Sequence, residues 1–397
     1  MAAALLSLIA LSSTVPLTTA FVPIPPSTTY SLSYDYSGQN FFNNFQFFSD
    51  ADPTKGHVDY VDMATANSLG LAGFLKGLDT NATANSTGPI YLGVDYTTNI
   101  ANSTDSRGRK SVRVSSVQKF NQALIIADVL HMPAPVCGTW PAYWLLGSGA
   151  IWPEAGEIDI LENVNDATSN KYTLHTSTGI VTANHTGTGM KGRLSTSNCD
   201  VNAPGQDKNV GCSTFEAACI KSYGDALNDN NGGVFATLID ELGIRMWFFE
   251  RSAIPADITA GRPSPPHHSQ PTGSKGNETS ATILNMDTGV LTNSTWGLPN
   301  ARFDSPDNGP GAIQKHFRDM QIIINTAFCG DWAGSVWDNN PTCKSLAPTC
   351  KEYVSAHPEA FEDVYWAFNG IRVYEPVRGL GTVPFPDSPM GNGTITG

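Results

Sequence analysis

The sequence has little positive charge. Its 397 residues contain 23 Lys and Arg against 36 Asp and Glu, which gives a formal net charge of −13. A surface of this sign repels phosphate groups, which argues against binding nucleic acid or an anionic membrane through a basic patch. We therefore expect a neutral ligand, and neither nucleic acid nor membrane as a partner.

Long hydrophobic runs are also missing. The first apolar run, in MAAALLSLIALSSTVPLTTA, is broken by Pro16 and polar residues before it reaches the roughly 20 residues that cross a bilayer. It resembles a secretory signal peptide, with small residues up to Ala20, although no basic residue follows Met1; a buried first helix is the alternative. The final stretch, MGNGTITG, has no hydrophobic tail for a lipid anchor. We predict a signal peptide at residues 1–20, a secreted, extracellular protein, and a disordered tail at residues 386–397.

The paired C-x2-C spacing that is typical of zinc sites is absent. In an exported chain, the seven cysteines predict up to three disulfides and one free thiol, with Cys199 and Cys212 as the best candidates for a local bridge. Asn-x-Ser/Thr sequons, which need solvent-facing loops when glycosylated, also agree with export. The cysteines are Cys137, Cys199, Cys212, Cys219, Cys329, Cys343 and Cys350, and the sequons begin at Asn81, Asn85, Asn102, Asn184, Asn277, Asn293 and Asn392.

Amphipathic helical patterns longer than about three turns are absent, and so are internal repeats and a convincing linker. With 37 glycines and 26 prolines, the chain instead has short runs of β-branched and aromatic residues bounded by turn formers. These runs predict an all-β fold, with one sandwich or jelly-roll domain over residues 21–385. The clearest strands are expected at residues 110–117, 123–130, 139–146, 156–162, 171–177, 244–250, 320–328 and 365–375.

Residues 262–294 interrupt this pattern. They are polar, contain proline and have few strand signals, so we expect a flexible surface insertion. His267 and His268 lie in it, but neighbouring histidines in a proline-rich loop are a weak metal signal, and we predict no metal-binding residues. Translated intron sequence is a second interpretation of the segment.

The stretch GEIDILEN places three carboxylates close together. Side chains alternate along a strand, so Glu157 and Asp159 share one face while the isoleucines share the other. Strict alternation would bring Leu161, and not Glu162, to the acidic face. We predict a one-residue bulge near Ile160 and Leu161, which returns Glu162 to the side of Glu157.

The cluster has the properties of an acid/base site. Three carboxyls on one face cannot all ionise readily, so at least one proton should be retained near neutral pH, as a general acid requires. Retaining glycosidases use two carboxyl groups about 5–5.5 Å apart. We assign the nucleophile to Glu157, the acid/base to Glu162 and an orienting role to Asp159. From these residues alone, a solvated acidic face or a calcium site is the alternative.

The run GTWPAYWLLGSGAIWPEAGEIDILE resembles the catalytic strand of glycoside hydrolase family 16, whose laminarinase-type motif is Glu-x-Asp-x-x-Glu. The segments YSGQNFFNNFQFFSDADPTKGHVDYV, GRKSVRVSS, TLHTS, FCGDWAGSVW and WAFNGIRVYE resemble secreted fungal endo-1,3(4)-β-glucanases of that family. The resemblance covers most of residues 30–376. It implies a β-jelly-roll sandwich of two antiparallel sheets with a concave glucan cleft. It also implies endo-hydrolysis with retention, in which Glu157 is the nucleophile, Asp159 the assisting residue and Glu162 the acid/base.

Aromatic side chains should line such a cleft, because sugar rings stack their apolar faces on aromatic rings. Trp144, Trp152 and Trp332 are the candidates for substrate contact. Trp140, at an even offset from Trp144 on the same predicted strand, ranks below them. Core filling is the alternative for each of these tryptophans.

Two polar residues are candidates for the same cleft. The resemblance places a histidine near the carboxylates on the adjacent strand, and His175 in TLHTS fits this position; a structural histidine is the alternative. Arg113 either reaches the cleft or only pairs with a carboxylate.

We thus predict an endo-β-glucanase that acts as a monomer on β-1,3 or mixed β-1,3/1,4 glucan. A cell-wall glucan transglycosylase is the second reading. A non-catalytic glucan-binding protein is the third, and it is disfavoured because such relatives lose the glutamates. The chemistry implies no organic cofactor, and a structural calcium ion is compatible with the sequence.

Overall fold

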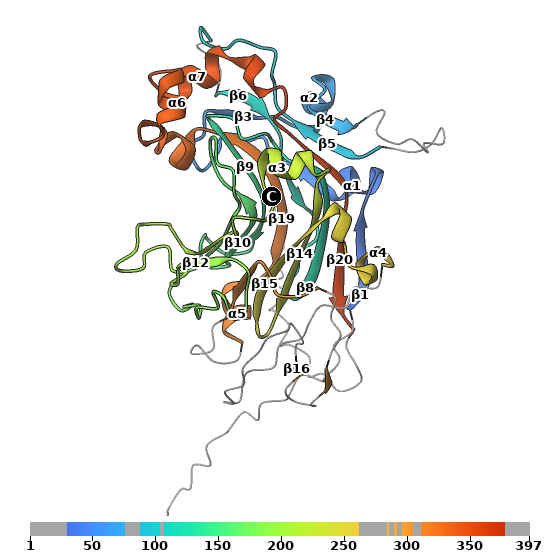
Figure 1. The fold of residues 1–397 in the computed structure, drawn as a ribbon. Helices are drawn as coiled ribbons and strands as arrows, with labels where there is room; N and C mark the ends of the chain where they lie inside the picture. The colour runs from blue at the N-terminus through green and yellow to red at the C-terminus, as the bar shows by residue number, and fades with distance from the viewer. Residues whose placement is uncertain are drawn as a thin grey trace, which may run out of the picture.

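Two sheets pack face to face around one large apolar core in the computed structural model (Figure 1). The predicted signal peptide at residues 1–20, the predicted tail at residues 386–397 and most of the predicted insertion at residues 262–294 lie outside the described residues. The structure describes residues 30–75, 88–103, 107–261, 284–285, 290–291, 296–304 and 311–377.

The inner sheet, which carries the acidic stretch, has eight strands with antiparallel pairing throughout. It curves so that the face bearing this stretch is concave (Figure 1). In hydrogen-bonded order its strands are β12 (Arg193–Thr196), β13 (Cys212–Phe215), β11 (Lys171–His175), β10 (Glu157–Glu162), β9 (Thr139–Gly147), β19 (Met320–Phe328), β7 (Arg113–Ser116) and β2 (Phe45–Phe47).

The outer sheet is also antiparallel and has eight strands. Its long strand β20 pairs with β8, β5 and β1, so the last described strand lies in the middle of the sheet. The strands are β18 (Ala301–Phe303), β15 (Gly243–Glu250), β14 (Gly233–Asp240), β8 (Ala123–His131), β20 (Tyr365–Pro376), β5 (Ile90–Gly93), β4 (Ala72–Phe74) and β1 (Tyr30–Tyr36).

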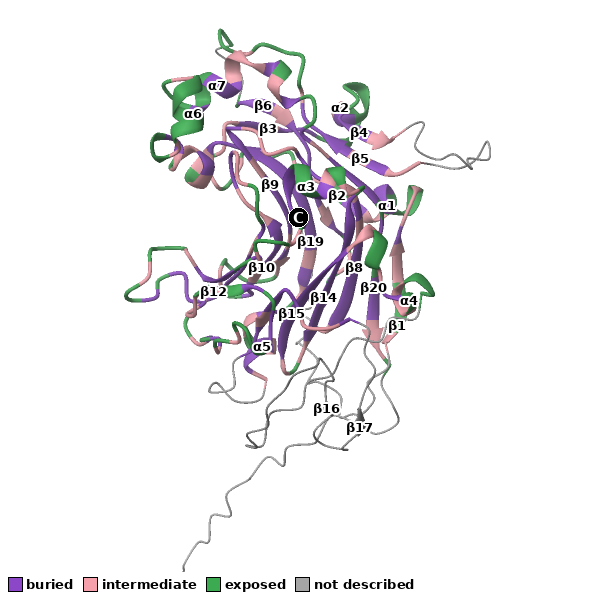
Figure 2. Cartoon of the chain, viewed as in Figure 1, coloured by how far each residue is buried: buried purple, intermediate pink, exposed green. Residues whose placement is uncertain are grey.

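Strand β8 is apolar on both faces. Ile125 and Ala127 enter the main core, while Leu124 and Ile126 pack into a second cluster that includes Trp296. This second layer explains why the run ALIIADVL is continuously apolar instead of alternating. Buried residues accordingly run along the strands of both sheets (Figure 2).

A third apolar cluster lies beside the short helices α6 and α7 at one end of the sandwich (Figure 1). Two disulfides fasten these helices to it: Cys343 of α6 bonds Cys137, and Cys350 of α7 bonds Cys329. Within the described residues no α-helix exceeds the 7 residues of α7, in line with the missing helical periodicity. The helices are α1 (Gln39–Asn44), α2 (Met63–Ser68), α3 (Gly224–Asp229), α4 (Ala256–Thr259), α5 (Ala312–His316), α6 (Pro341–Leu346) and α7 (Cys350–Ala356).

The cysteine predictions are confirmed. Cys199 and Cys212 form the expected local bridge, which closes the loop before β13. With the two disulfides of the third cluster this makes three bridges, and Cys219 is left as an exposed free thiol.

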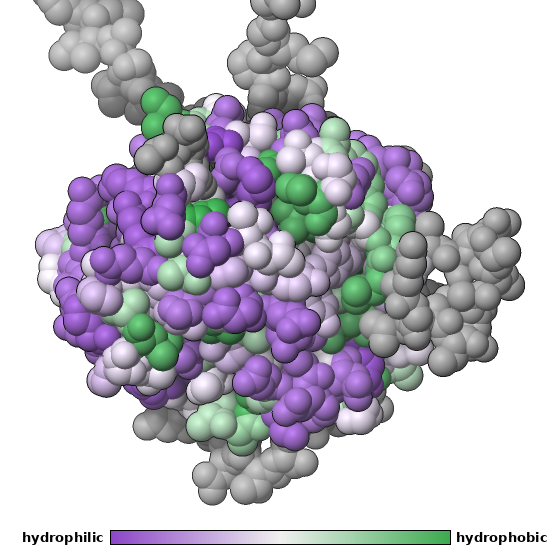
Figure 3. Space-filling model, turned by 90° about the horizontal axis from the view of Figure 1, so that it is seen from above, coloured by the Kyte–Doolittle hydropathy of each residue, from purple (hydrophilic) through white to green (hydrophobic). Residues whose placement is uncertain are grey.

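The surface is mostly hydrophilic when seen from above, with hydrophobic residues in small separate patches (Figure 3). Among the helices in the described part of the chain, none has the length and hydropathy needed to cross a bilayer.

All eight predicted runs form strands, with one correction. The run at residues 110–117 divides at Val112, because β6 (Arg109–Ser111) pairs in parallel with β3 (Val58–Tyr60) while β7 joins the inner sheet. Strand β14 was not predicted, because its continuous apolar run has no period that separates strand from helix. Within residues 262–294 the structure describes only the antiparallel pair β16 (Leu284–Asn285) and β17 (Val290–Leu291).

Candidate active site

The predicted bulge is present in β10. The pairing of β10 with β9 shifts register between Asp159 and Leu161, so Ile160 is the extra residue. Ile160 and Leu161 are both fully buried in the core. The shift therefore leaves Glu162 on the same face as Glu157, as the alternation of side chains requires.

Glu157 is held by a loop and by the neighbouring strand. Trp152, in the loop before β10, donates its Nε1–H to Glu157 Oε2 at 2.8 Å. His175 lies opposite Glu157 on β11, with its Nε2 3.9 Å from Glu157 Oε1. The side chain of Glu157 keeps 19% of its surface exposed, so a ligand on the concave face can reach the carboxylate.

Asp159 is the most deeply buried member of the cluster. Its side chain is 3% exposed, and its Oδ2 lies 3.3 Å from His175 Nε2. No described group forms a hydrogen bond with this oxygen, so the ionised form of Asp159 is poorly stabilised. Gly211 supports His175 from the other side: its φ is +62°, and a Cβ there would lie 3.0 Å from His175 Nδ1. Both conditions favour glycine at this position.

Glu162 is bordered by aromatic rings. Trp140 donates its Nε1–H to Glu162 Oε1 at 2.7 Å. The ring of Trp332 lies edge-on to Trp140, with centroids 5.6 Å apart, and the Nζ of Lys171 stands 5.2 Å from the Trp332 centroid. A flat aromatic surface and a cation therefore stand beside this second glutamate.

Burial raises the pKa of all three carboxyls. The pKa of Glu157 rises to about 8, mainly by burial and then by the nearby charge of Asp159. Burial and Asp159 also raise the pKa of Glu162, against the hydrogen bond from Trp140. For Asp159, burial raises the pKa and the Lys171 charge opposes the rise. Because each negative charge disfavours the next, the cluster titrates as one unit that keeps at least one proton near neutral pH.

A second group of contacts fixes Trp144. Its Nε1–H donates to Asn325 Oδ1 of β19 at 2.8 Å. The guanidinium of Arg113 lies 5.2 Å from the Trp144 ring and 4.8 Å from the Phe48 ring, and its Nη1 is 4.0 Å from Asp52 Oδ1. Arg113 thus packs against the candidate tryptophan and also faces a carboxylate.

The structure brings the three predicted carboxylates together with Trp152 and His175. Trp140, which ranked below the other tryptophans, contacts a glutamate directly. Lys171 and Asn325 were not predicted as part of the site. Strand pairing places them there, and a single Lys or Asn in a strand gives no sequence signal for such a position.

Two groups of described side chains bring three potential metal ligands within 4.8 Å of one another. One uses sulfurs that are bonded to each other in a disulfide, so it offers no thiolate. The other consists of residues of the carboxylate cluster itself. The groups are Cys137, Asp166 and Cys343, and Glu157, Asp159 and His175.

Comparison with known sequences agrees with this geometry. The model of the XgeA-like catalytic domain of glycoside hydrolase family 16 matches residues 45–288 and 279–374. A relative from Arthroderma benhamiae, named endo-1,3(4)-beta-glucanase, is 39% identical over 358 residues, which is 90% of this chain and 66% of the relative. A probable endo-1,3(4)-beta-glucanase from Aspergillus clavatus is 34% identical over 365 residues, and the match covers 91% of this chain but 48% of the relative. The chain thus spans about half to two thirds of these relatives.

Two solved structures are also similar. Laminarinase 16A from Phanerochaete chrysosporium, with beta-glucans in its donor and acceptor sites, is 34% identical and has a TM-score of 0.69. An elongating family 16 beta-1,3-glucosyltransferase is 32% identical and has a TM-score of 0.68. Each match covers 87% of this chain and 100% of the other chain.

Proposed function

The chain belongs to glycoside hydrolase family 16, and from that membership we propose that it is a secreted endo-β-glucanase. Its proposed substrates are β-1,3 and/or mixed β-1,3/1,4 glucans, which it hydrolyses with retention of configuration. The observation that carries the proposal is the pair Glu157 and Glu162 on one concave face, each bound by a tryptophan N–H. The name of the Arthroderma relative supports the same activity.

In the proposed first step, ionised Glu157 attacks the anomeric carbon of the bound glucan. Protonated Glu162 gives its proton to the glycosidic oxygen, so the leaving sugar departs as an alcohol. The reaction leaves a glycosyl ester on Glu157. Asp159, which raises the pKa of Glu162, helps to keep the required proton there.

In the second step, Glu162 is a carboxylate and acts as a base. It takes a proton from water, whose oxygen attacks the anomeric carbon and releases Glu157. Two inversions at the same carbon retain its configuration.

Five further side chains are proposed to contact the glucan. All lie in or beside the strands of the inner sheet and surround the carboxylates or the Trp144 group. Aromatic rings would stack on sugar faces, and the polar groups would bind hydroxyls. They are Trp144, Trp152, Trp332, His175 and Arg113.

The first test measures reducing ends released from laminarin and from barley β-glucan at mildly acidic pH. We expect activity from the full chain and at least a ~1,000-fold loss in Glu157→Gln, because the amide cannot form the ester intermediate. Glu154→Gln, the same change at an exposed glutamate of the preceding loop, is the matched control and should stay active. A folded Glu157→Gln protein with normal activity would contradict the assignment.

A transglycosylase is the second candidate. The similar structure of an elongating glucosyltransferase favours it, as does the aromatic surface of Trp332 and Trp140 close to Glu162, where an acceptor sugar could displace water. Mass spectrometry of products from a short oligosaccharide separates the two reactions: transfer gives products longer than the substrate, and hydrolysis gives only shorter ones.

We further propose that the protein acts outside the cell as a monomer and without an organic cofactor. The three disulfides support an oxidising compartment. Glu157 and Glu162 supply the nucleophile and the proton, so the proposed reaction uses neither an organic cofactor nor a metal ion. Dialysis against EDTA, which removes metal ions, should therefore leave kcat unchanged. A lower Tm after EDTA treatment would instead indicate a structural calcium ion.

A further inference from the structure

Three partly exposed rings meet on the outer sheet, and a fourth lies in the segment that follows β5. His131 of β8, Ala367 of β20 and Tyr91 of β5 stand side by side in register, and Tyr365 shares their face two residues before Ala367. The His131 and Tyr365 rings stack with centroids 3.8 Å apart and planes at 2°, and Tyr91 lies 5.3 Å from Tyr365. Tyr96, just after β5, is 40% exposed. We call His131, Tyr365, Tyr91 and Tyr96 the tyrosine platform.

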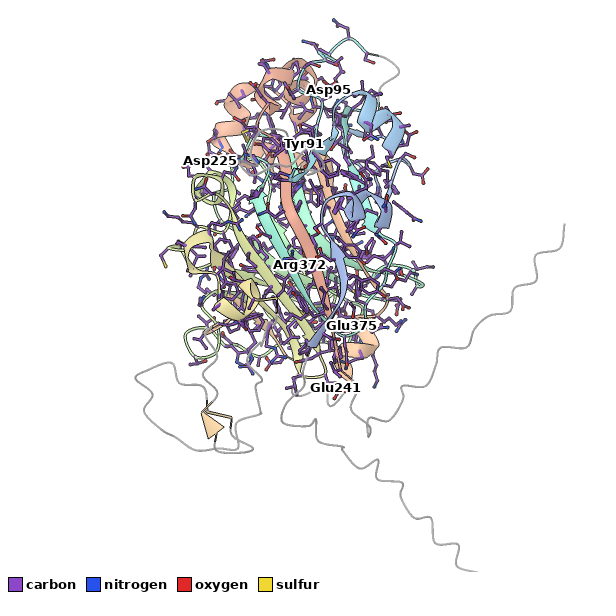
Figure 4. All side chains as sticks on the ribbon, turned by 90° about the vertical axis from the view of Figure 1, so that its right-hand side faces the viewer. Tyr91, Asp95, Asp225, Glu241, Arg372 and Glu375 are labelled. Atoms are coloured by element: carbon purple, nitrogen blue, oxygen red, sulfur yellow. A yellow bond between two sulfur atoms is a disulfide. The ribbon has the colours of Figure 1, made fainter. Side chains whose placement is uncertain are left out.

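The tyrosine platform faces away from the main core. Leu92 and Trp366, the chain neighbours of its strand tyrosines, are buried in that core, and successive side chains of a strand point to opposite faces. Glu157 lies on the concave face of the inner sheet, which also points away from the main core. The two sites therefore occupy opposite surfaces of the sandwich. Figure 4 looks onto the outer sheet, where Tyr91 lies below Asp95 and across from Asp225.

The platform is held in place by hydrogen bonds. Asp95 Oδ1 accepts from the backbone N–H groups of Thr97 and Thr98, which fixes the turn that carries Tyr96. Arg109 donates to the carbonyl oxygen of Asp95 at 2.7 Å. His131 Nδ1 lies 3.0 Å from the carbonyl oxygen of Tyr365. Rings that are fixed before a ligand arrives cost less entropy on binding.

The chemistry of the platform suits a neutral polyhydroxylated ligand. Tyr96 is the most exposed of the three tyrosines, so its hydroxyl is open to a ligand. Two exposed carboxylates lie on this side of the molecule: Asp363 stands two residues before Tyr365 in the chain, and Figure 4 shows Asp225 in the same view as Tyr91. They accept hydrogen bonds from hydroxyls and repel anions. Because His131 and Tyr365 cover each other's faces, the exposed ring of Tyr96 is the one proposed to stack on a sugar, beside these acceptors.

We propose that the tyrosine platform is a second binding site for a β-glucan chain, separate from the site of cleavage. The inference rests on the proposed function for the identity of the polymer. A glucan held at the platform keeps its other segments at a raised local concentration near the enzyme. The platform should therefore lower KM for long or insoluble glucan without changing kcat on short oligosaccharides.

The test compares Tyr96→Ala and Tyr91→Ala with the parent chain, all carrying Glu157→Gln so that the polymer survives. Retardation in native gels containing laminarin measures binding. We expect each variant to bind about three- to tenfold more weakly, the range for loss of one stacking ring. Tyr96 is exposed, so its replacement should not disturb folding. Leu32→Ala, at an exposed apolar residue on β1 of the same sheet, is the control and should bind as the parent does.

A kinetic arm uses the same platform variants with Glu157 intact. We expect KM to rise on insoluble β-1,3-glucan, with kcat/KM on a short oligosaccharide unchanged. Equal retardation of parent and both variants would overturn the platform even if the enzyme is active, and so would a parent that laminarin does not retard. If the chain with Glu157 intact hydrolyses no glucan, but the platform variants still lose retardation by laminarin, the platform stands and the proposed function is rejected.

Discussion

The indole N–H groups of Trp140 and Trp152 each donate to one glutamate of the site, at 2.7 and 2.8 Å. A hydrogen bond to a carboxylate stabilises its charged form, so both bonds lower the pKa of their partner. They act against the burial that raises both values. Trp152 therefore acts on the pKa of Glu157, and Trp140 acts on the pKa of Glu162.

Trp140→Phe keeps an aromatic ring beside Glu162 but removes the donor. The pKa of Glu162 should rise further, and because Glu162 must be protonated in the first step, the alkaline limb of the kcat/KM profile should move to higher pH. We expect kcat/KM at the optimum to fall about tenfold, as for loss of a hydrogen bond to a charged group. Initial rates between pH 4 and 9 measure both effects.

Trp152→Phe is the matched change at Glu157 and should move the other limb. Without the donor the pKa of Glu157 rises, and because the nucleophile must be ionised, the acidic limb should shift to higher pH. Because the carboxyls titrate together, both limbs should move, with the larger shift on the acidic limb here and on the alkaline limb in Trp140→Phe. The reverse pattern would contradict the division of roles.

The residue scale also shows what the sequence could predict. The common face of the three carboxylates could be predicted from the sequence, because strand alternation and one bulge determine it. Tryptophan type alone could not separate site from core: four of the eight tryptophans lie at the inner-sheet site, and four are buried in the apolar clusters. The site tryptophans are Trp140, Trp144, Trp152 and Trp332, and the buried ones are Trp247, Trp296, Trp337 and Trp366.

At the scale of the element, the bulge of β10 is the feature that sets the site. Deleting Ile160 restores strict alternation in which Glu157, Asp159 and Glu162 still share a face. The deletion removes a fully buried side chain, so the free energy of unfolding should fall by about 2–5 kcal/mol while some activity remains. Urea denaturation and reducing-sugar release are the measurements. A folded, fully inactive deletion variant would show that the bulge also sets the distance between the glutamates.

The local disulfide supports the site through β13. Replacing Cys199 and Cys212 by alanine opens a loop of sequence separation 13 and should cost about 3 kcal/mol. Tm should fall by about 4 °C, because a chain of this length has a large unfolding entropy. Activity should fall as well, because Cys212 pairs with Leu174, the residue before His175 on β11. Cys219→Ser, at the exposed free thiol, is the control and should change neither; an unchanged Tm in the double variant would refute the role of the bridge.

Elements were predicted in proportion to their length and pattern. The eight predicted runs form strands, whereas the eight-residue β14 was missed because its apolar run has no period, and β2 and β4, with three residues each, are too short to show one. The division between β6 and β7 at Val112 depends on the parallel partner β3, about fifty residues earlier in the chain. Such a partner is a tertiary fact, which no local pattern contains.

At the scale of the whole molecule, the carboxylate cluster makes stability depend on pH. Burial raises the pKa of Glu157, Asp159 and Glu162 to about 8, from about 4 in the unfolded chain. Between these values the native state binds more protons than the unfolded state, so stability should fall as pH rises from about 4 to 8. Asp159→Asn should remove more than one third of this slope, because the Asp159 charge also raises the pKa of both glutamates. Differential scanning fluorimetry across this range measures the slope, and a slope that is the same in Asp159→Asn and in the parent would refute the argument.

The order of strands has a consequence for how the protein is made. In the inner sheet β19 lies between β9 and β7, and in the outer sheet β20 lies between β8 and β5. The strands at both central positions come from the last third of the chain. Cys137 can form its disulfide only after Cys343 has been synthesised. Neither sheet can complete its strand pairing before these late strands have left the ribosome. Until then, the strands made earlier keep unpaired edges. A chain whose synthesis stops before residue 376 should therefore be degraded. It should not fold into a smaller active enzyme.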